Sequence, residues 1–268
     1  MDFTIKIYKE LLKSLQDAGF FFQTFAGYSD KSTKQQKEVD HHKRIILRHD
    51  VDARPENSLR FARIQAEMGM VGTYYFRMVP QSYNEAIIKE MVALGHEVGY
   101  HYETMDTCKG DVDKAYEEFC RNLETFRKLT PVNTISMHGS PLSNFDNRDI
   151  WEKYNYKKLG LVAEPYFDID FNQLYYITDT GRRWDGHLYN VRDKATKENP
   201  VTNEGFLKLR FRHTSEIIEA VESGNFPEKA MLNFHPQRWN DEAVPWVKEL
   251  VFQYIKNQVK RILILLRK

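Results

Sequence analysis

Residues that could bind a metal or transfer a proton occur at four places in this sequence, each at the end of a short apolar run. The segment 49–52 holds a histidine and two aspartates, the segment 101–103 holds a histidine and a glutamate, and single histidines follow at His138 and His235. Carboxylate oxygens and imidazole nitrogens are common protein ligands of divalent ions such as zinc. A further carboxylate and imidazole beside such an ion can act as base and acid. These residue types therefore suit metal-assisted hydrolysis.

These residues can act together if the apolar runs are neighbouring parallel strands, because the carboxyl ends of such strands meet at one mouth of a β/α barrel. Side chains two residues apart in a strand point to the same face. Asp50 and Asp52 therefore point the same way if the strand continues, and so do His101 and Glu103. We expect two carboxylates and two or three imidazoles to converge at this mouth and to hold a divalent ion.

Each of these residues alone also has an ordinary structural explanation. An aspartate after a buried strand often caps the next helix or accepts hydrogen bonds from loop amides. A single histidine such as His138 or His235 is more often a hydrogen-bonded residue of the core or rim than a ligand. We assign His41 and His42, which lie in a charged segment, to solvent. The coincidence of suitable side chains at four strand ends favours the functional interpretation.

Short apolar runs alternate with amphipathic stretches, which predicts β/α units. Strands are expected at residues 44–49, 72–77, 96–103, 133–138 and 230–235, with shorter ones near 159–163, 173–178 and 186–190. Helices are expected from Pro55, around 87–94 and 112–126, and at 214–223 and roughly 244–267. The expected fold class is α/β, a distorted (β/α) barrel of about seven parallel strands with outer helices. One domain would cover residues 1–268, with 1–43 as an N-terminal helix and loop extension.

Composition limits the classes of protein and partner. Lys and Arg number 39 and Asp and Glu 38, which gives a formal net charge of +1. A nucleic-acid binder normally has a clear basic excess, so no nucleic-acid partner is expected. Cys108 and Cys120 resemble neither a disulfide framework nor a zinc cluster, which favours a reducing compartment. No segment resembles a signal peptide or approaches about 18 consecutive apolar residues, so we expect a cytoplasmic protein without membrane insertion.

The carboxyl-terminal sequence QVKRILILLRK is both basic and apolar. Such a sequence can lie on a membrane surface. We interpret it instead as part of a helix that closes the barrel and carries a solvated basic stripe, which is the more common arrangement. Neither composition nor motifs determine the oligomeric state.

Over roughly residues 44–240 the sequence resembles the polysaccharide deacetylase superfamily, the chitooligosaccharide deacetylase-like proteins of NodB homology. LRHDVDARPENSLRFARIQAEMGMVGTYYFR resembles its first motif region, where an apolar strand runs into an aspartate pair and then a helix and a strand. GHEVGYHYETMD resembles the second motif, usually written G-x-H-[ST]-x-x-H, and MLNFHP resembles the last. SMHGSP occupies the place of the third, usually R-x-P-Y. The HDVD form of the first motif would make this chain a divergent member.

The resemblance implies a metal-dependent deacetylase on a barrel scaffold. Asp50 would be the general base that acts on a metal-activated water, and His235 the general acid that protonates the leaving amine. Asp52 and His101 would bind the ion, which we expect to be Zn, with Co, Mn or Ni as alternatives. The assignment of Asp52 requires a one-residue shift, because ungapped alignment places Val51 at the family's second aspartate.

The sequence departs from the family pattern in its second and third motifs. The family's second metal histidine falls at Met105, and a thioether is a poor ligand for such an ion. We expect His138 as the third ligand, with Glu103 as the second choice and His49 as the third. The arginine that normally steadies the base aspartate is absent from SMHGSP, and Arg48 or His138 could replace it.

We expect Arg48, Tyr102, Asp179 and Trp184 around the substrate. Asp179 and Trp184 are expected because TDTGRRW resembles the family's pocket-supporting Asp and Trp, and Tyr102 because it is an aromatic residue near the candidate loops that could form a platform for a sugar ring. The implied reaction removes an N-acyl group, such as acetyl, from an amino sugar or glycan precursor. Two alternatives stay open: hydrolysis of another linear or cyclic C–N amide, and a catalytically silent glycan-binding or accessory protein on the same scaffold.

Overall fold

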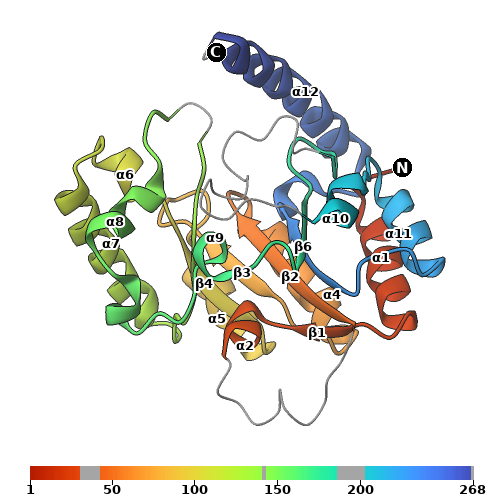
Figure 1. Cartoon of the computed structure of the whole chain (residues 1–268), viewed down its shortest axis with the longest axis horizontal. Helices are drawn as coiled ribbons and strands as arrows, with labels where there is room; N and C mark the ends of the chain where they lie inside the picture. The colour runs from red at the N-terminus through yellow and green to blue at the C-terminus, as the bar shows by residue number, and fades with distance from the viewer. Residues whose placement is uncertain (31–42, 141–142, 186–202, 267–268) are drawn as a thin grey trace.

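One parallel sheet forms the centre of the molecule in the computed structural model, which describes residues 1–30, 43–140, 143–185 and 203–266 (Figure 1). The strands are β1 (Phe21–Gln23), β2 (Arg44–Val51), β3 (Thr73–Phe76), β4 (Glu97–Tyr102), β5 (Ile135–Met137), β6 (Tyr175–Thr178) and β7 (Lys229–Phe234). They lie in the order β5–β4–β3–β2–β7–β6, and β1 pairs with the first half of β2. Because β5 and β6 are the two ends of this curled sheet, the architecture is an incomplete (β/α) barrel, and the predicted fold class is confirmed.

Helices follow most strands and pack against the outer face of the sheet (Figure 1). The longer ones are α1 (Ile5–Asp17), α4 (Pro55–Glu67), α5 (Glu85–Ala93), α7 (Val112–Arg127), α11 (Thr214–Glu222) and α12 (Ala243–Leu266). Shorter segments lie in the connections: α2 (Phe25–Ser29), α6 (Thr104–Thr107), α8 (Ile150–Lys153), α9 (Pro165–Asp168), α10 (Glu204–Lys208), η1 (Asn147–Asp149), η2 (Tyr156–Leu159) and η4 (Pro236–Arg238). In α7, for example, Asp111 caps the first turn by accepting from the backbone N–H of Lys114, and Ala115, Phe119 and Leu123 form the buried stripe.

Most of the predicted elements are present, and one expected strand is absent. Residues 159–163 do not form a strand, because Gly160 ends η2 in a left-handed conformation (φ 73°) and a single bridge joins Thr134 to Ala163. The segment 186–190, also expected as a strand, lies outside the described residues. β1 lies within residues 1–43, for which the sequence predicts a helix and a loop.

The two faces of the sheet have separate apolar cores. Alternate residues of β2, among them Leu47 and Val51, belong to the large cluster under the outer helices. Ile46 belongs to a smaller inner cluster, with Tyr75 and Met231. Because side chains alternate along a strand, the inner row of β2 continues from Ile46 to Arg48 and Asp50. The inner face therefore changes from apolar to charged toward the carboxyl ends of the strands.

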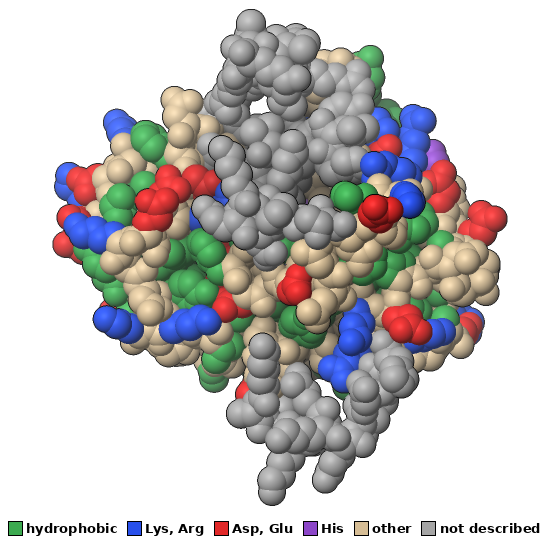
Figure 2. All heavy atoms as spheres, viewed as in Figure 1, with side chains coloured by type: hydrophobic (Ala, Val, Ile, Leu, Met, Phe, Trp, Pro, Cys, Tyr) green, Lys and Arg blue, Asp and Glu red, His purple; other side chains and the backbone are tan. Residues whose placement is uncertain are grey.

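Charged side chains of both signs are interspersed on the face of the molecule shown in Figure 2. This mixture agrees with the near-equal numbers of basic and acidic residues in the sequence. Cys108 and Cys120 do not form a disulfide. Within the described residues, no helix has the length and apolar content needed to span a bilayer.

The inner face leaves no space for a side chain at Gly99, which lies opposite Tyr75 in the β3–β4 register. The hydroxyl of Tyr75 is hydrogen bonded to Oγ1 of Thr134 at 2.9 Å. A Cβ atom at Gly99 would overlap the Tyr75 ring and lie 2.7 Å from the carbonyl oxygen of Thr134. Gly99 thus allows Tyr75 to pack across the sheet, two residues before His101.

We predict that Gly99→Ala lowers the free energy of unfolding by about 1–3 kcal/mol, because the added methyl group overpacks the inner face. Urea-induced unfolding measures this change. Gly205→Ala in α10 is the matched control, since its Cβ would meet only the Asn203 side chain, at 3.2 Å. Equal stability of Gly99→Ala and the wild type would show that the inner face is not tightly packed at this position.

Candidate active site

Most of the predicted site residues meet at the carboxyl ends of β2, β4, β5 and β7, which with β3 are successive strands of the sheet. β2 and the residue after it supply Arg48, Asp50 and Asp52, β4 supplies His101 and Glu103, β5 is followed by His138, and β7 is followed by His235. Asp179, which follows β6, lies behind His235. Parallel pairing of β2 with β3 and β7, of β3 with β4, and of β4 with β5 brings these ends together.

Asp50 is held in place by three hydrogen bonds. The guanidinium of Arg48 donates from Nε to Oδ1 at 2.9 Å and from Nη2 to Oδ2 at 3.0 Å. Nδ2 of Asn233 donates to Oδ2 at 2.9 Å. Burial alone would raise the pKa of Asp50, but the charge of Arg48, with smaller contributions from His101 and His235, outweighs it and holds this pKa well below its usual range. Asp50 is therefore ionised and fixed in orientation.

Asp52 is surrounded by imidazoles. Its Oδ1 lies 3.7 Å from Nε2 of His101 and 3.6 Å from Nε2 of His138. Its Oδ2 lies 3.9 Å from Nε2 of His235 and accepts a hydrogen bond from Nε2 of Gln237 at 3.1 Å. Burial favours a higher pKa for Asp52, but the histidines, His235 most of all, hold it at about 2. Asp52 is therefore a carboxylate that faces several nitrogen ligands at once.

His101 presents one free nitrogen to this carboxylate. Its Nδ1 lies 2.9 Å from the carbonyl oxygen of Ser136. Because a carbonyl can only accept, Nδ1 donates, and Nε2 keeps its lone pair on the side of Asp52. Burial lowers the pKa of His101 to about 4, although Asp50 acts in the opposite direction. The ring is thus neutral near pH 7, which is the state required of a metal ligand.

His138 lies between two carboxylates. Its Nδ1 is 3.0 Å from Oε2 of Glu103, and its Nε2 faces Asp52. Glu103 is itself bound by Arg77, which donates from Nε at 3.1 Å and from Nη2 at 2.7 Å. Burial favours a lower pKa for His138, but Glu103 and Asp52 outweigh it and raise this pKa. Glu103 therefore lies behind His138, although the orientation of the two groups does not meet hydrogen-bond geometry, and His138 faces Asp52 with its Nε2.

His235 is oriented by Asp179. Nδ1 of His235 lies 2.6 Å from Oδ1 of Asp179, and its backbone N–H donates to Oδ2 at 3.0 Å. Trp239 and Arg238 also donate to the Asp179 carboxylate, at 2.7 and 3.0 Å. Burial tends to raise the pKa of Asp179, but His235 and Arg238 outweigh it and lower this pKa. Nε2 of His235 is left pointing toward Asp50 and Asp52, at 4.0 and 3.9 Å.

Nε2 of His101 and Nε2 of His138 both lie close to the same carboxylate oxygen, Oδ1 of Asp52. Oδ1 of Asp52 is buried and has no hydrogen-bond partner within the described residues, and a buried unpaired carboxylate oxygen is unfavourable. Within the described residues, no group of three or more His, Cys, Asp or Glu side chains has the geometry needed to hold a metal ion. Ligands about 2.0–2.1 Å from a tetrahedral zinc ion lie about 3.3–3.4 Å apart. The present separations of 3.6 and 3.7 Å are only slightly wider.

Three predicted site residues lie away from this cluster. His49 points to the opposite face of β2, where it stacks on Tyr74 at 4.0 Å, and burial lowers its pKa to about 3. Tyr102 is in the outer core, because it alternates with His101 along β4. Trp184 is also in that core and donates from Nε1 to Oγ1 of Thr214 at 2.9 Å.

Met105, at the family's second histidine position, is likewise buried in the outer core. Its backbone N–H donates to the side chain of Asn147 at 2.9 Å, and the amide of Asn147 donates to the carbonyl oxygen of His138 at 2.8 Å. Asn147 therefore ties the start of α6 to the loop that carries His138.

Sequence reasoning did not identify Asn233, Gln237 or Arg77 as part of the site. A signal was present for Asn233, because it precedes His235 by two residues in MLNFHP and so shares its face of the strand. Arg77 directly follows β3 and could have been included with the other strand-end residues. Gln237 lies in η4, and its contact with Asp52 depends on the path of that loop.

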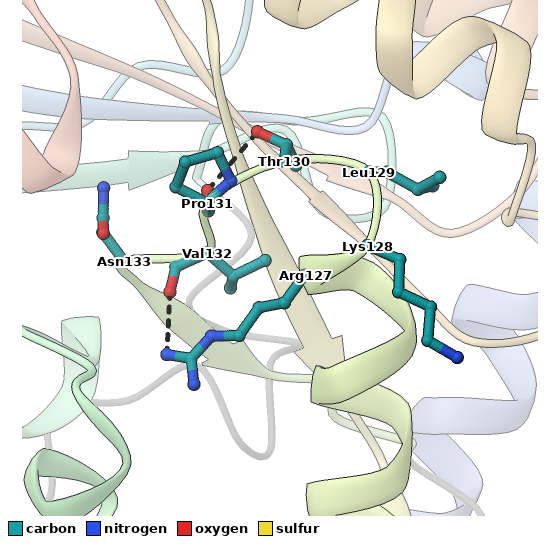
Figure 3. Close-up of a pocket in the computed structure, with 7 residues that line it drawn as sticks. All are labelled: Arg127, Lys128, Leu129, Thr130, Pro131, Val132 and Asn133. Atoms are coloured by element: carbon teal, nitrogen blue, oxygen red, sulfur yellow. Dashed lines mark hydrogen bonds between the residues drawn. The ribbon is translucent and has the colours of Figure 1, made fainter.

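A separate open hollow of about 410 Å³ lies in the connection between α7 and β5 (Figure 3). It is lined by Arg127, Lys128, Leu129, Thr130, Pro131, Val132 and Asn133. This connection precedes β5, so the hollow is at the end of the sheet opposite the histidine cluster. It contains no carboxylate or imidazole, and we therefore assign the functional site to the cluster.

No protein-family model and no curated protein matches this sequence. Among solved structures, the chain is similar to a CE4 family pseudoenzyme from Bacillus anthracis, at 13% identity and a TM-score of 0.44, over 82% of this chain and 62% of that one. A mutant of that pseudoenzyme with restored enzymatic activity is similar at 12% identity and a TM-score of 0.43, over 82% of this chain and 64% of that one. PdaA from Bacillus subtilis, a family 4 carbohydrate esterase, is similar at 14% identity and a TM-score of 0.37, over 92% of this chain and 83% of that one.

The chain spans less than two thirds of the length of the two Bacillus anthracis structures. At this level of identity and structural similarity, neither the activity nor the inactivity of a neighbour is transferred to this chain.

We predict that Arg48→Met lowers the free energy of unfolding by about 3–5 kcal/mol, because it leaves the buried carboxylate of Asp50 without its cation. Urea-induced unfolding measures the loss. Arg63→Met is the control, since the Arg63–Glu90 ion pair is largely exposed and should contribute less than about 1 kcal/mol. Similar losses for the two variants would contradict a structural role for the Arg48–Asp50 pair.

Proposed function

We propose that this protein is a metal-dependent hydrolase that removes an N-acyl group, such as acetyl, from an amino sugar or glycan precursor. The observation that supports this most directly is the position of Asp52. Its Oδ1 is buried without a hydrogen-bond donor and faces Nε2 of both His101 and His138. A flanking carboxylate, Asp50, and a flanking imidazole, His235, complete the set that amide hydrolysis requires.

Asp52, His101 and His138 would hold the ion, which we expect to be Zn, with Co, Mn or Ni as alternatives. Nitrogen and oxygen donors of this kind suit all four ions. His138 would take the place that Met105 leaves empty in the family pattern. Glu103 would support His138 rather than bind the ion, because Arg77 and His138 already occupy its carboxylate.

When bound, a divalent ion would polarise the amide carbonyl and lower the pKa of the attacking water, so that even a weakly basic carboxylate can take a proton from it. Asp50 is the carboxylate available for that proton. The two hydrogen bonds from the Arg48 guanidinium keep Asp50 ionised and leave Oδ2 of Asp50 facing His101 and His235. Because its pKa is low, Asp50 is a weak base, and it can accept a proton only from a water molecule whose own pKa has been lowered.

His235 would donate the proton that the leaving amine needs. Asp179 fixes the ring with Nδ1 toward itself, so that Nε2 faces the site. The carboxylate of Asp179 thereby holds the ring in the orientation that an acid catalyst at this position needs. Asp50 and His235 would therefore have complementary roles beside the proposed metal position, with Oδ2 of Asp50 and Nε2 of His235 4.0 Å apart.

We predict that the protein, loaded in turn with Zn, Co, Mn and Ni, releases acetate from N-acetylglucosamine oligomers. Asp50→Asn and His235→Asn should each lower this rate by about 10²-fold or more, because each removes one proton-transfer group. Both variants should keep their metal content, since neither residue is a proposed ligand. Asp17→Asn and His213→Asn, which change exposed side chains, should retain wild-type rates.

Full activity of Asp50→Asn would eliminate Asp50 as the base. Oligomer binding without acetate release from the metal-loaded wild type would favour a silent glycan-binding protein instead. Release of acetate from simple amides, but not from the sugar, would redirect the proposal to another C–N amide.

A further inference from the structure

The terminal helix α12 faces the protein with its polar side. Gln253 is buried, and its Nε2 donates to Oδ1 of Asn257 at 2.9 Å. Asn257 in turn donates to the carbonyl oxygen of Gly181 at 3.1 Å. One turn into the helix, the backbone carbonyl of Trp246 accepts from Nη1 of Arg182 at 2.9 Å, and the Arg182 guanidinium lies over the Trp246 ring at 4.5 Å. Spacings of seven and four residues place Trp246, Gln253 and Asn257 on one side of α12.

The opposite side of α12 is apolar and exposed. Val244, Val247, Val251 and Ile255 expose 64%, 49%, 53% and 55% of their surface. Their spacing of three, four and four residues aligns them in one stripe along the helix. Figure 1 shows α12 standing out from the rest of the molecule, on the side toward which the strands point. A surface helix normally buries such a stripe, so this arrangement marks a surface that binds something outside the described fold.

The charge of the same segment identifies the kind of partner. From residue 248 onward the sequence contains one acidic residue, Glu249, and six basic ones: Lys248, Lys256, Lys260, Arg261, Arg267 and Lys268. A second copy of the helix would bring this positive charge against itself. An anionic surface would instead attract it, and a helix that combines an apolar stripe with Lys and Arg is typical of binding in the plane of a lipid headgroup layer.

We propose that α12 binds the surface of a bilayer that contains anionic lipid, with its apolar stripe in the headgroup layer and its axis parallel to the membrane. The helix lies on the bilayer rather than across it, because charged residues interrupt its apolar sequence and it does not qualify as a spanning helix. The anchoring loop that contains Gly181 and Arg182 begins just after Asp179, the partner of His235. Membrane binding therefore holds the strand-end cluster near the bilayer, whichever reaction that cluster performs.

Cosedimentation with vesicles tests this proposal on the whole protein. We expect binding to vesicles of phosphatidylcholine and phosphatidylglycerol in equal amounts, and at least about tenfold weaker binding to phosphatidylcholine alone. Binding to the anionic vesicles should fall as salt is added, because exposed charges are screened. No binding to the anionic vesicles, or equal binding to both kinds, would overturn the proposal.

Variants of the protein show whether vesicle binding depends on the apolar stripe of α12 or on other parts of the surface. The triple variant Val247→Ser, Val251→Ser, Ile255→Ser should bind anionic vesicles at least about tenfold more weakly, since it removes most of the apolar contact. Lys248→Glu, a single change at an exposed position, should weaken binding severalfold and keeps the test valid if the triple variant fails to fold. The double variant Val162→Ser, Phe167→Ser, which changes equally exposed apolar residues on another surface, should bind as the wild type does.

The alternative partner of the apolar stripe is a second copy of this chain. Light scattering without lipid tests it by measuring the mass of the protein in solution. A monomer in solution supports the proposal. A stable dimer that the triple variant dissociates, together with no vesicle binding, would assign the stripe to a second copy of this chain.

Discussion

Four carboxylates meet in a small and largely buried volume at the carboxyl ends of the strands, and their repulsion must be balanced before the sheet can hold them together. Arg48 balances Asp50, Arg77 balances Glu103 and Arg238 balances Asp179. Asp52 is the exception: its ion-pair contacts within the described part of the chain are all with histidines. A divalent cation at this position would satisfy Asp52 and use the neutral nitrogen of His101.

The alternation of side chains made much of this site predictable. Asp50 and His101 lie on the inner face because their strands are regular up to these residues, and the same rule places His49 and Tyr102 on the outer face. Tyr102 was expected in the pocket as an aromatic residue near the candidate loops, whereas strict alternation with His101 argues against that position. Arg48, one of two residues considered as a partner for Asp50, forms that pair through a two-residue spacing on one strand.

Other features of the site and fold depend on how strands and helices that are distant in the sequence pair or pack. They could not be derived from the residue pattern within one segment. His138 reaches Glu103 because β5 pairs with β4 so that Met137 lies opposite Tyr102, which no sequence spacing reveals. β1 is too short, at three residues, for its periodicity to be recognised. The apolar residues around 159–163 resembled a strand, but the left-handed turn at Gly160 ends η2 there and leaves only one bridge. For α12, composition indicated a basic, apolar helix, and only its docking contacts reveal that the polar side faces inward.

The most direct test of the account is the zinc affinity of the purified protein, compared with His138→Ala and with His213→Ala. A zinc site at Asp52, His101 and His138 predicts about one tightly bound zinc ion per chain for the wild type and for His213→Ala, whose histidine is exposed and lies beside Asp2. His138→Ala should bind zinc at least about tenfold more weakly, because it removes a proposed ligand. Loss of only the hydrogen-bonding partner of a ligand typically lowers metal affinity by about 10–100-fold. Zinc binding that is unchanged in His138→Ala would contradict the proposed ligand set.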